Sequence, residues 1–212
     1  FIKNSKIKSE YFVINKKNHL ELCHKINSFS KVLFIFPLYV DSLPVGLMGF
    51  LKTLEKNPPT NKPVISVLIN CGFIEPYQND VAIKMIQLFC KKNGYHFGSV
   101  LQIGSGEAIL KTPFKLLVNR KIKKLAKAIN KEQQIKLTVT MPLSKKIFIK
   151  ASTNYWKNYG KTNNLDYNQL ATMEIEKDIA IKTKELDDLQ KQFDVYKAKM
   201  ESLLISQLEL LK

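Results

Sequence analysis

Short apolar runs alternate with amphipathic segments along most of the chain. The runs are rich in β-branched and aromatic residues, and each stops at a proline, an asparagine or a glycine. They predict strands over residues 31–36, 64–69 and 99–103. The segments around them have apolar residues at helical spacing and predict helices over residues 19–29, 45–55, 80–92 and 113–130. Runs this apolar indicate strands that helices cover on both faces, so we expect a doubly wound parallel α/β sheet.

Weaker patterns flank these elements. The run Tyr11–Ile14 predicts a short strand, and the aromatic segment Tyr155–Tyr159 predicts a last element that covers the core. Gly94 predicts the end of the helix that begins at Asp80, because glycine readily adopts the left-handed conformation that closes a helix. A polar stretch over residues 160–164 loosens the chain, and we therefore place the α/β domain at residues 1–165.

The pattern changes in the C-terminal tail, where apolar residues recur seven apart. One register holds Ile179, Leu186, Phe193 and Met200, and its companion holds Ile175, Leu189, Tyr196, Leu203 and Leu210. Lys182 and Gln207 interrupt this a/d pattern. The spacing predicts a long coiled-coil helix over residues 172–212 and self-association into a homo-oligomer. The alternative is a helix that packs back onto the α/β domain.

The charge is spread unevenly. The chain has 34 Lys+Arg against 18 Asp+Glu, a net charge of +16, but residues 172–212 hold seven lysines and nine acidic residues. Residues 111–131 alone carry eight basic residues and no acidic one. Such a helix can bind nucleic acid or an anionic membrane face. Because Arg120 is the only arginine in the segment, we favour a solvated lysine face, expect no nucleic acid partner, and keep membrane contact as the alternative.

The longest apolar stretch, residues 32–51, approaches the length of a membrane span. Pro37, Asp41 and Pro44 lie near its centre, so we favour a strand, turn and helix of a soluble domain. The three cysteines are isolated, without a CxxC pair, which argues against a disulfide framework and a metal site. With no signal segment at the start, we expect a cytoplasmic protein.

Each of the three strong strands is followed by an unusual turn. The first turn is Pro37, Leu38, Tyr39, Val40, Asp41, Ser42, Leu43 and Pro44; the second is Asn70, Cys71, Gly72, Phe73, Ile74 and Glu75; the third is Gly104, Ser105, Gly106 and Glu107. Parallel strands place such turns at one edge, where ligands of open sheets bind. The glycines would let a ligand approach the backbone closely, and Tyr39 and Phe73 offer flat apolar faces. Together they indicate a planar, phosphorylated cofactor.

These turns resemble the flavin loops of the flavodoxin-like NAD(P)H-dependent FMN reductases. Residues 36–44 are similar to the second flavin loop of that family, residues 70–75 to the third, and residues 103–107 to the turn after the next strand. The resemblance covers about residues 8–165. It implies a flavodoxin-like sheet that binds FMN against the loops 37–44 and 70–75. It also implies that a nicotinamide donor, NADH or NADPH, passes hydride through the flavin to a small acceptor, with no catalytic acid–base pair in the protein.

The chain departs from that family before Phe36. Members open with a central strand and a Gly-Ser-Pro-rich loop that cradles the FMN phosphate, and no such loop precedes Phe36. We therefore expect the sheet to be incomplete at its N-terminal side, and the phosphate cradle to be missing from this chain.

The tail residues 197–212 resemble the closing helix of DivIVA-type scaffold proteins, which implies parallel self-association. Two functions stay open. The chain is an FMN-dependent NAD(P)H oxidoreductase, a cytoplasmic flavoprotein, or it is a non-catalytic self-associating scaffold with a vestigial flavodoxin-like domain. A tail that joined the domain through fusion of two reading frames is a further alternative.

Overall fold

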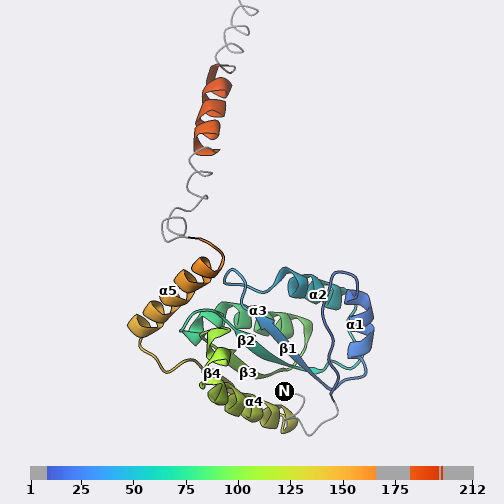
Figure 1. Ribbon diagram of the computed structural model, residues 1–212. Helices are drawn as coiled ribbons and strands as arrows, with labels where there is room; N and C mark the ends of the chain where they lie inside the picture. The colour runs from blue at the N-terminus through green and yellow to red at the C-terminus, as the bar shows by residue number, and fades with distance from the viewer. Residues whose placement is uncertain (1–8, 166–181, 196, 198–212) are drawn as a thin grey trace, which may run out of the picture. The chain divides into compact units, whose positions relative to one another are not determined.

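The computed structural model describes residues 9–165, 182–195 and 197 (Figure 1). The chain divides into two compact units, Phe1–Lys145 and Lys146–Lys212. In the first unit four strands alternate with four α-helices. Helix α5 (Lys145–Thr162) and a helix over residues 182–195 belong to the second unit.

The sheet of the first unit is parallel throughout. Its strands are β1 (Lys31–Pro37), β2 (Val64–Asn70), β3 (Phe97–Ile103) and β4 (Lys136–Val139), and their spatial order is β1-β2-β3-β4. Phe34 lies opposite Val67, and Val67 opposite Val100, so these side chains share one face. Such a sheet is consistent with a flavodoxin-like fold.

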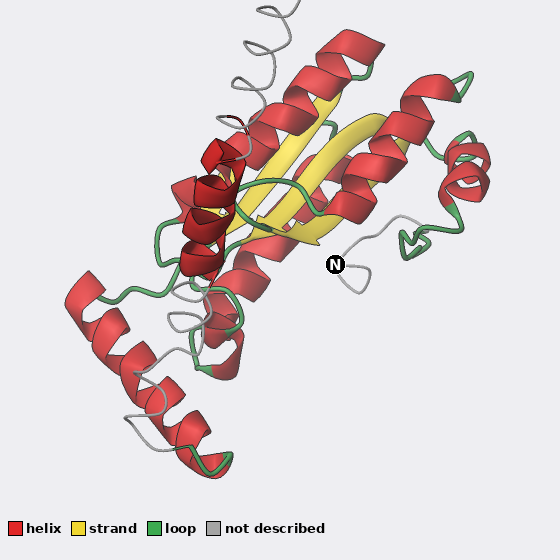
Figure 2. Cartoon of the chain, turned by 90° about the horizontal axis from the view of Figure 1, so that it is seen from above, coloured by secondary structure: helices red, strands yellow, loops and turns green. Residues whose placement is uncertain are grey.

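Helices cover the sheet on two sides (Figures 1 and 2). The helices are α1 (His19–Ile26), α2 (Val45–Lys56), α3 (Asp80–Asn93) and α4 (Lys115–Asn130), and two short 3₁₀ turns, η2 (Pro76–Asn79) and η3 (Ala108–Lys111), follow the loops. The buried side chains of α1, α2 and α3 form one core with the face that holds Val67 and Val100. Helix α4 packs on β3 and β4 from the opposite face.

The connection through α4 differs from the connections before it. All strands step in the same direction across the sheet, yet α2 and α3 lie on one face and α4 on the other. The β3–α4–β4 crossover therefore has the opposite hand to the two preceding ones, although one hand dominates in parallel sheets. The strand that this crossover places, β4, is only four residues long and lies at the sheet edge.

Most of the expected elements are confirmed. The three strong strands and four helices form within two or three residues of their expected ends, and Gly94 closes α3 with a φ of 69°. The apolar stretch 32–51 folds as a strand, a turn and the start of α2, as expected. Across the described residues, no helix is both long and apolar enough to cross a membrane.

Four details are wrong. Residues 11–14 form no strand, Pro113 precedes the helix rather than lying in its first turn, and β4 was not expected. The strand β1 is not covered on both faces: Ile35 is 54% exposed. Ile35 shares its face with Leu68, which is buried, so the side of the sheet that α4 covers is left open towards β1.

The C-terminal predictions find partial support. The described part of the tail is a short helix over 182–195, with Leu186, Leu189 and Phe193 exposed, so a long coiled coil is not shown. The other heptad positions lie outside the described residues, apart from Lys182. The segment Tyr155–Tyr159 belongs to α5, where only Gly160 is buried, so it supplies no buried aromatic side chain. Because α5 and the sheet belong to different units, the expectation of a core-covering element stays a prediction.

Candidate functional site

The three predicted loops lie together at the carboxyl edge of the sheet. Backbone hydrogen bonds join them in a row: the Leu38 N–H donates to Asn70 O at 2.7 Å, and the Cys71 N–H to Ile103 O at 3.0 Å. The Gly106 N–H donates to Cys71 O at 2.7 Å and closes the row. The expectation that the turns share one edge is confirmed, because each follows a strand of one parallel ladder.

The first loop ends in a tight exposed turn. Tyr39 and Ser42 exchange two backbone hydrogen bonds of 3.1 and 3.0 Å, and the residues between them, Val40 and Asp41, have positive φ values of 47° and 54°. A β-branched residue in the left-handed region is strained, at a cost of order 1–3 kcal/mol. Val40 is 84% exposed and Tyr39 is 62% exposed, while Leu43 is buried and anchors the turn. The strained turn therefore presents apolar side chains to solvent.

The second loop presents Phe73, which is 51% exposed, above a buried network. Cys71 is buried, and burial raises the pKa of its thiol against the opposing hydrogen bonds from the Phe73 backbone and Asn79. The Asn79 side-chain amide donates to Cys71 Sγ at 3.4 Å and to Pro76 O at 3.0 Å. The thiol is therefore neutral at ordinary pH and is unsuited to act as a thiolate nucleophile.

The third loop lies beneath the second. Gly104, Ser105 and Gly106 are buried, and the Ser105 hydroxyl is 2.9 Å from Thr140 Oγ1, which donates to Ile74 O. The Ser105 side chain therefore contacts other loops instead of solvent, whereas Glu107 at the end of the loop is exposed.

The glycines have different roles. A Cβ on Gly104 would lie 2.8 Å from Ile74 O, and a Cβ on Gly106 would lie 3.0 Å from the Cα of Gly72. Both glycines are therefore needed for the loops to pack on one another. Gly72 is exposed, and a Cβ there would meet nothing within 4 Å. Of the three, only Gly72 leaves open space for a ligand beside the backbone.

The predicted site residues thus form an outer and an inner layer. Exposed or half-buried are Pro37, Leu38, Tyr39, Val40, Asp41, Ser42, Pro44, Asn70, Gly72, Phe73 and Glu75; buried are Leu43, Cys71, Gly104, Ser105 and Gly106. Sequence reasoning missed Asn79 and Thr140, which hold the layers together. Their signal was weak: each is a single polar residue near the end of an element.

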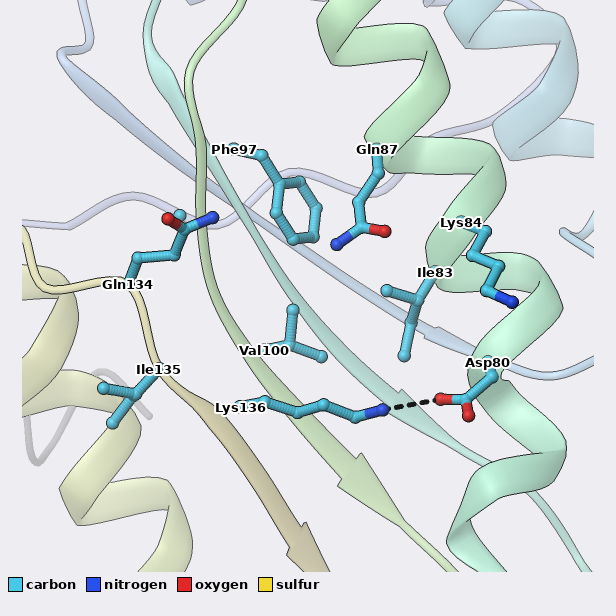
Figure 3. A pocket seen from close by; sticks show the side chains of 10 residues that line it. Asp80, Ile83, Lys84, Gln87, Phe97, Val100, Gln134, Ile135 and Lys136 are labelled. Atoms are coloured by element: carbon cyan, nitrogen blue, oxygen red, sulfur yellow. Dashed lines mark hydrogen bonds and ion pairs between the residues drawn. The ribbon is translucent and has the colours of Figure 1, made fainter.

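A separate cavity of about 280 Å³ lies between α3 and the strands β3 and β4 (Figure 3). Val100, Ile83 and Phe97 supply its apolar lining. At one end Lys136 Nζ lies 2.8 Å from Asp80 Oδ1, which also accepts from Gln102 Nε2 at 2.7 Å. The hydrogen bond from Lys136 lowers the pKa of Asp80 although partial burial opposes it. This cavity lies on the α3 face of the sheet and includes none of the predicted loop residues.

Metal ligands are absent from the described parts of the chain: no three His, Cys, Asp or Glu side chains there are grouped to hold an ion. The imidazole of His19 packs edge-on against Phe50, with centroids 5.9 Å apart.

Comparison with known proteins found no matching family, no matching curated protein and no matching solved structure. The fold is established only as an α/β sheet of four parallel strands that alternate with helices, and any proposal of function rests on the loop edge itself.

Proposed function

We propose that the edge formed by residues 37–44 and 70–75 binds the ring of FMN, and that the protein is an FMN-dependent NAD(P)H oxidoreductase with a small acceptor. The observation that carries this proposal is the open backbone at Gly72, next to the exposed Phe73, with Tyr39 also exposed on the adjoining loop. A planar ring can approach the backbone only where no side chain intervenes, and aromatic faces favour stacking with it.

The residues of this edge would hold and orient the ring. Tyr39 and Phe73 would contact its faces, and Gly72 would allow the backbone close to its edge. The row of hydrogen bonds between the loops keeps these positions fixed relative to one another. When bound, FMN would supply the redox chemistry, so the protein needs no acid–base pair of its own. The neutral Cys71 thiol agrees with such a passive role.

This edge offers few groups that could bind the phosphate of FMN. Gly104, Ser105 and Gly106 of the third loop are buried. Two lysines are already paired, Lys145 with Glu75 at 3.5 Å and Lys111 with Glu107 at 2.7 Å. We therefore expect the chain to bind the ring but not to grip the phosphate. FMN and riboflavin should then bind with affinities that differ by less than about tenfold, because a single charge-assisted phosphate contact contributes roughly that factor.

The test is a titration of the full chain with FMN and with riboflavin, in which the quenching of flavin fluorescence measures binding. Tyr39→Ala should weaken both affinities by roughly three- to tenfold, the contribution of one aromatic contact. Tyr11→Ala is the matched control, because Tyr11 is also an exposed tyrosine but belongs to none of the three loops. Absence of quenching by either flavin, or equal losses in both variants, would reject the proposal.

A second candidate is a self-associating scaffold. The observation that favours it is the exposed row Leu186, Leu189 and Phe193 on the tail helix, spaced as successive a, d and a positions of a heptad pattern. Light scattering of the full chain tests it. A dimer or larger assembly that becomes monomeric in Leu186→Asn/Phe193→Asn supports the scaffold, and a monomeric parent protein excludes it.

A further inference from the structure

Helix α5 combines a high positive charge with exposed aromatic side chains. It contains five lysines and no acidic residue. Ile149, Tyr155, Trp156 and Tyr159 are half or more exposed, with Trp156 at 60%. A cluster of exposed large aromatic residues on one helix is unusual at the surface of a globular protein and marks an interaction site.

Apart from Lys145 at the first position of the helix, which falls on the aromatic side, the lysines and the aromatic residues occupy different faces. At about 100° per residue, Lys146, Lys150, Lys157 and Lys161 fall within a stripe roughly 60° wide. On the other side, a broad arc holds Phe148, Ile149, Tyr155, Trp156 and Tyr159. The separation makes α5 an amphipathic helix with a cationic stripe and an aromatic face.

The aromatic face is continuous. The rings of Tyr155 and Tyr159 stack with centroids 6.3 Å apart, and Trp156 meets each of them edge-on at 5.4 and 5.9 Å. Tryptophan and tyrosine concentrate at membrane–water interfaces, where an apolar ring and a polar atom can both be accommodated.

Helix α4 is a natural comparison, because it is also strongly basic. Its apolar stripe, which includes Val118 and Leu125, is buried on the sheet. Its exposed surface carries lysines with Leu116 as the one large apolar exception. Helix α4 therefore presents a solvated lysine face, whereas the apolar face of α5 remains largely exposed.

We propose that α5 docks on an anionic lipid surface, lying in the interface plane. Its aromatic face would enter the boundary between headgroups and acyl chains, while the lysine stripe would contact anionic headgroups. Helix α5 is too polar to span a bilayer, which agrees with an interfacial position. Nucleic acid fits less well, because the aromatic residues and lysines would need to share one face and α5 contains no arginine.

Trp156 makes the test direct, because it is the only tryptophan in the chain. The full-length protein is mixed with vesicles of phosphatidylcholine alone, or of phosphatidylcholine and phosphatidylglycerol in equal parts. We expect a blue shift of tryptophan emission and co-flotation with the anionic vesicles only, both reversed by high salt. The result does not depend on flavin binding, so it stands or falls separately from the proposed oxidoreductase function.

Matched variants locate the contact. The quadruple variant Lys146→Glu/Lys150→Glu/Lys157→Glu/Lys161→Glu should abolish flotation. The quadruple variant Lys115→Glu/Lys123→Glu/Lys124→Glu/Lys127→Glu changes the net charge equally on α4 and should keep the Trp156 shift. Circular dichroism confirms that both variants are folded, and Tyr159→Ser/Phe148→Ser should weaken flotation without any change of charge.

Three outcomes would overturn the proposal. One is no shift with anionic vesicles. Another is tryptophan emission that is already blue-shifted and protected from acrylamide in the free protein, since the aromatic face would then be covered by protein. The third is a loss of flotation in the α4 variant as large as in the α5 variant, which would reduce the effect to net charge.

Discussion

At the scale of single residues, the three glycines at the loop edge are not needed for the same reason. From the sequence, all three glycines are expected to let a ligand approach the backbone, because each follows a strand. The structure assigns Gly104 and Gly106 to contacts between loops, and only Gly72 faces open space. A sequence cannot separate these cases, because the neighbours that would clash with a Cβ lie on other loops.

The difference predicts opposite effects of alanine. Gly106→Ala should lower the free energy of unfolding by about 1–3 kcal/mol, since φ is +43° and the Cβ would crowd Gly72. Gly72→Ala should change stability by less than about 0.5 kcal/mol, as for ordinary surface substitutions, but should weaken riboflavin binding. Urea unfolding measures the first quantity and flavin quenching the second. Equal stability of the two variants would contradict the assignment.

Tyr95 predicts a loss of stability in alkali. Burial raises its pKa to about 12, and burial likewise raises the pKa of Cys90 to about 12. Each group is thus more easily deprotonated in the unfolded chain, so stability is complete below pH 9 and falls as the pH rises towards 12. Urea unfolding at successive pH values measures the fall.

Tyr95→Phe provides the control for this effect. The Tyr95 hydroxyl is buried without a hydrogen-bond partner among the described residues, so its removal should not destabilise the protein at neutral pH. The variant should lose less stability between pH 10 and 12 than the parent protein. An unchanged slope would show that Tyr95 is not involved.

At the scale of elements, the sequence predicted a helix or strand correctly where the spacing of apolar residues and the glycine or proline at its end indicated the same element. The buried runs of β2 and β3, and Gly94 at the end of α3, are local signals that packing did not override. Residues 11–14 pair with no strand among the described residues, so their apolar run alone did not produce one. The strand β4 was not predicted because it has only four residues, two of them polar, and it depends on β3 for its hydrogen bonds.

Strands β1 and β2 have similar apolar sequences but different surroundings, and this predicts unequal substitution effects. Ile69→Ala should cost about 2–5 kcal/mol, because Ile69 is fully buried. Ile35→Ala should cost less than about 1 kcal/mol, because Ile35 is mostly exposed on the open part of its face. Chemical denaturation of the two variants gives both values. Comparable losses would mean that Ile35 is covered in solution.

At the scale of the whole molecule, much of the net charge of +16 lies on two basic helices, α4 and α5, whose apolar residues differ in burial. Helix α4 has buried its apolar stripe, and α5 has not. The sequence shows where the lysines are, but it does not show which helix packs its apolar stripe against the sheet. For the same reason the outer layer of the candidate site was predictable from turn residues, whereas the supporting contacts of Asn79 and Thr140 were not, since they join segments distant in sequence.

The unpaired side of β1 has a consequence for exchange in deuterated water. Within the described residues β1 pairs only with β2, and the bonds of Ser30 O and the Leu38 N–H to β2 show that even-numbered residues face that partner. The amides of Val32, Phe34 and Phe36 should therefore keep their protons for long periods, while those of Leu33 and Ile35 exchange quickly. Along a single strand, protection should alternate residue by residue, and any strand that adds to this edge would erase the alternation.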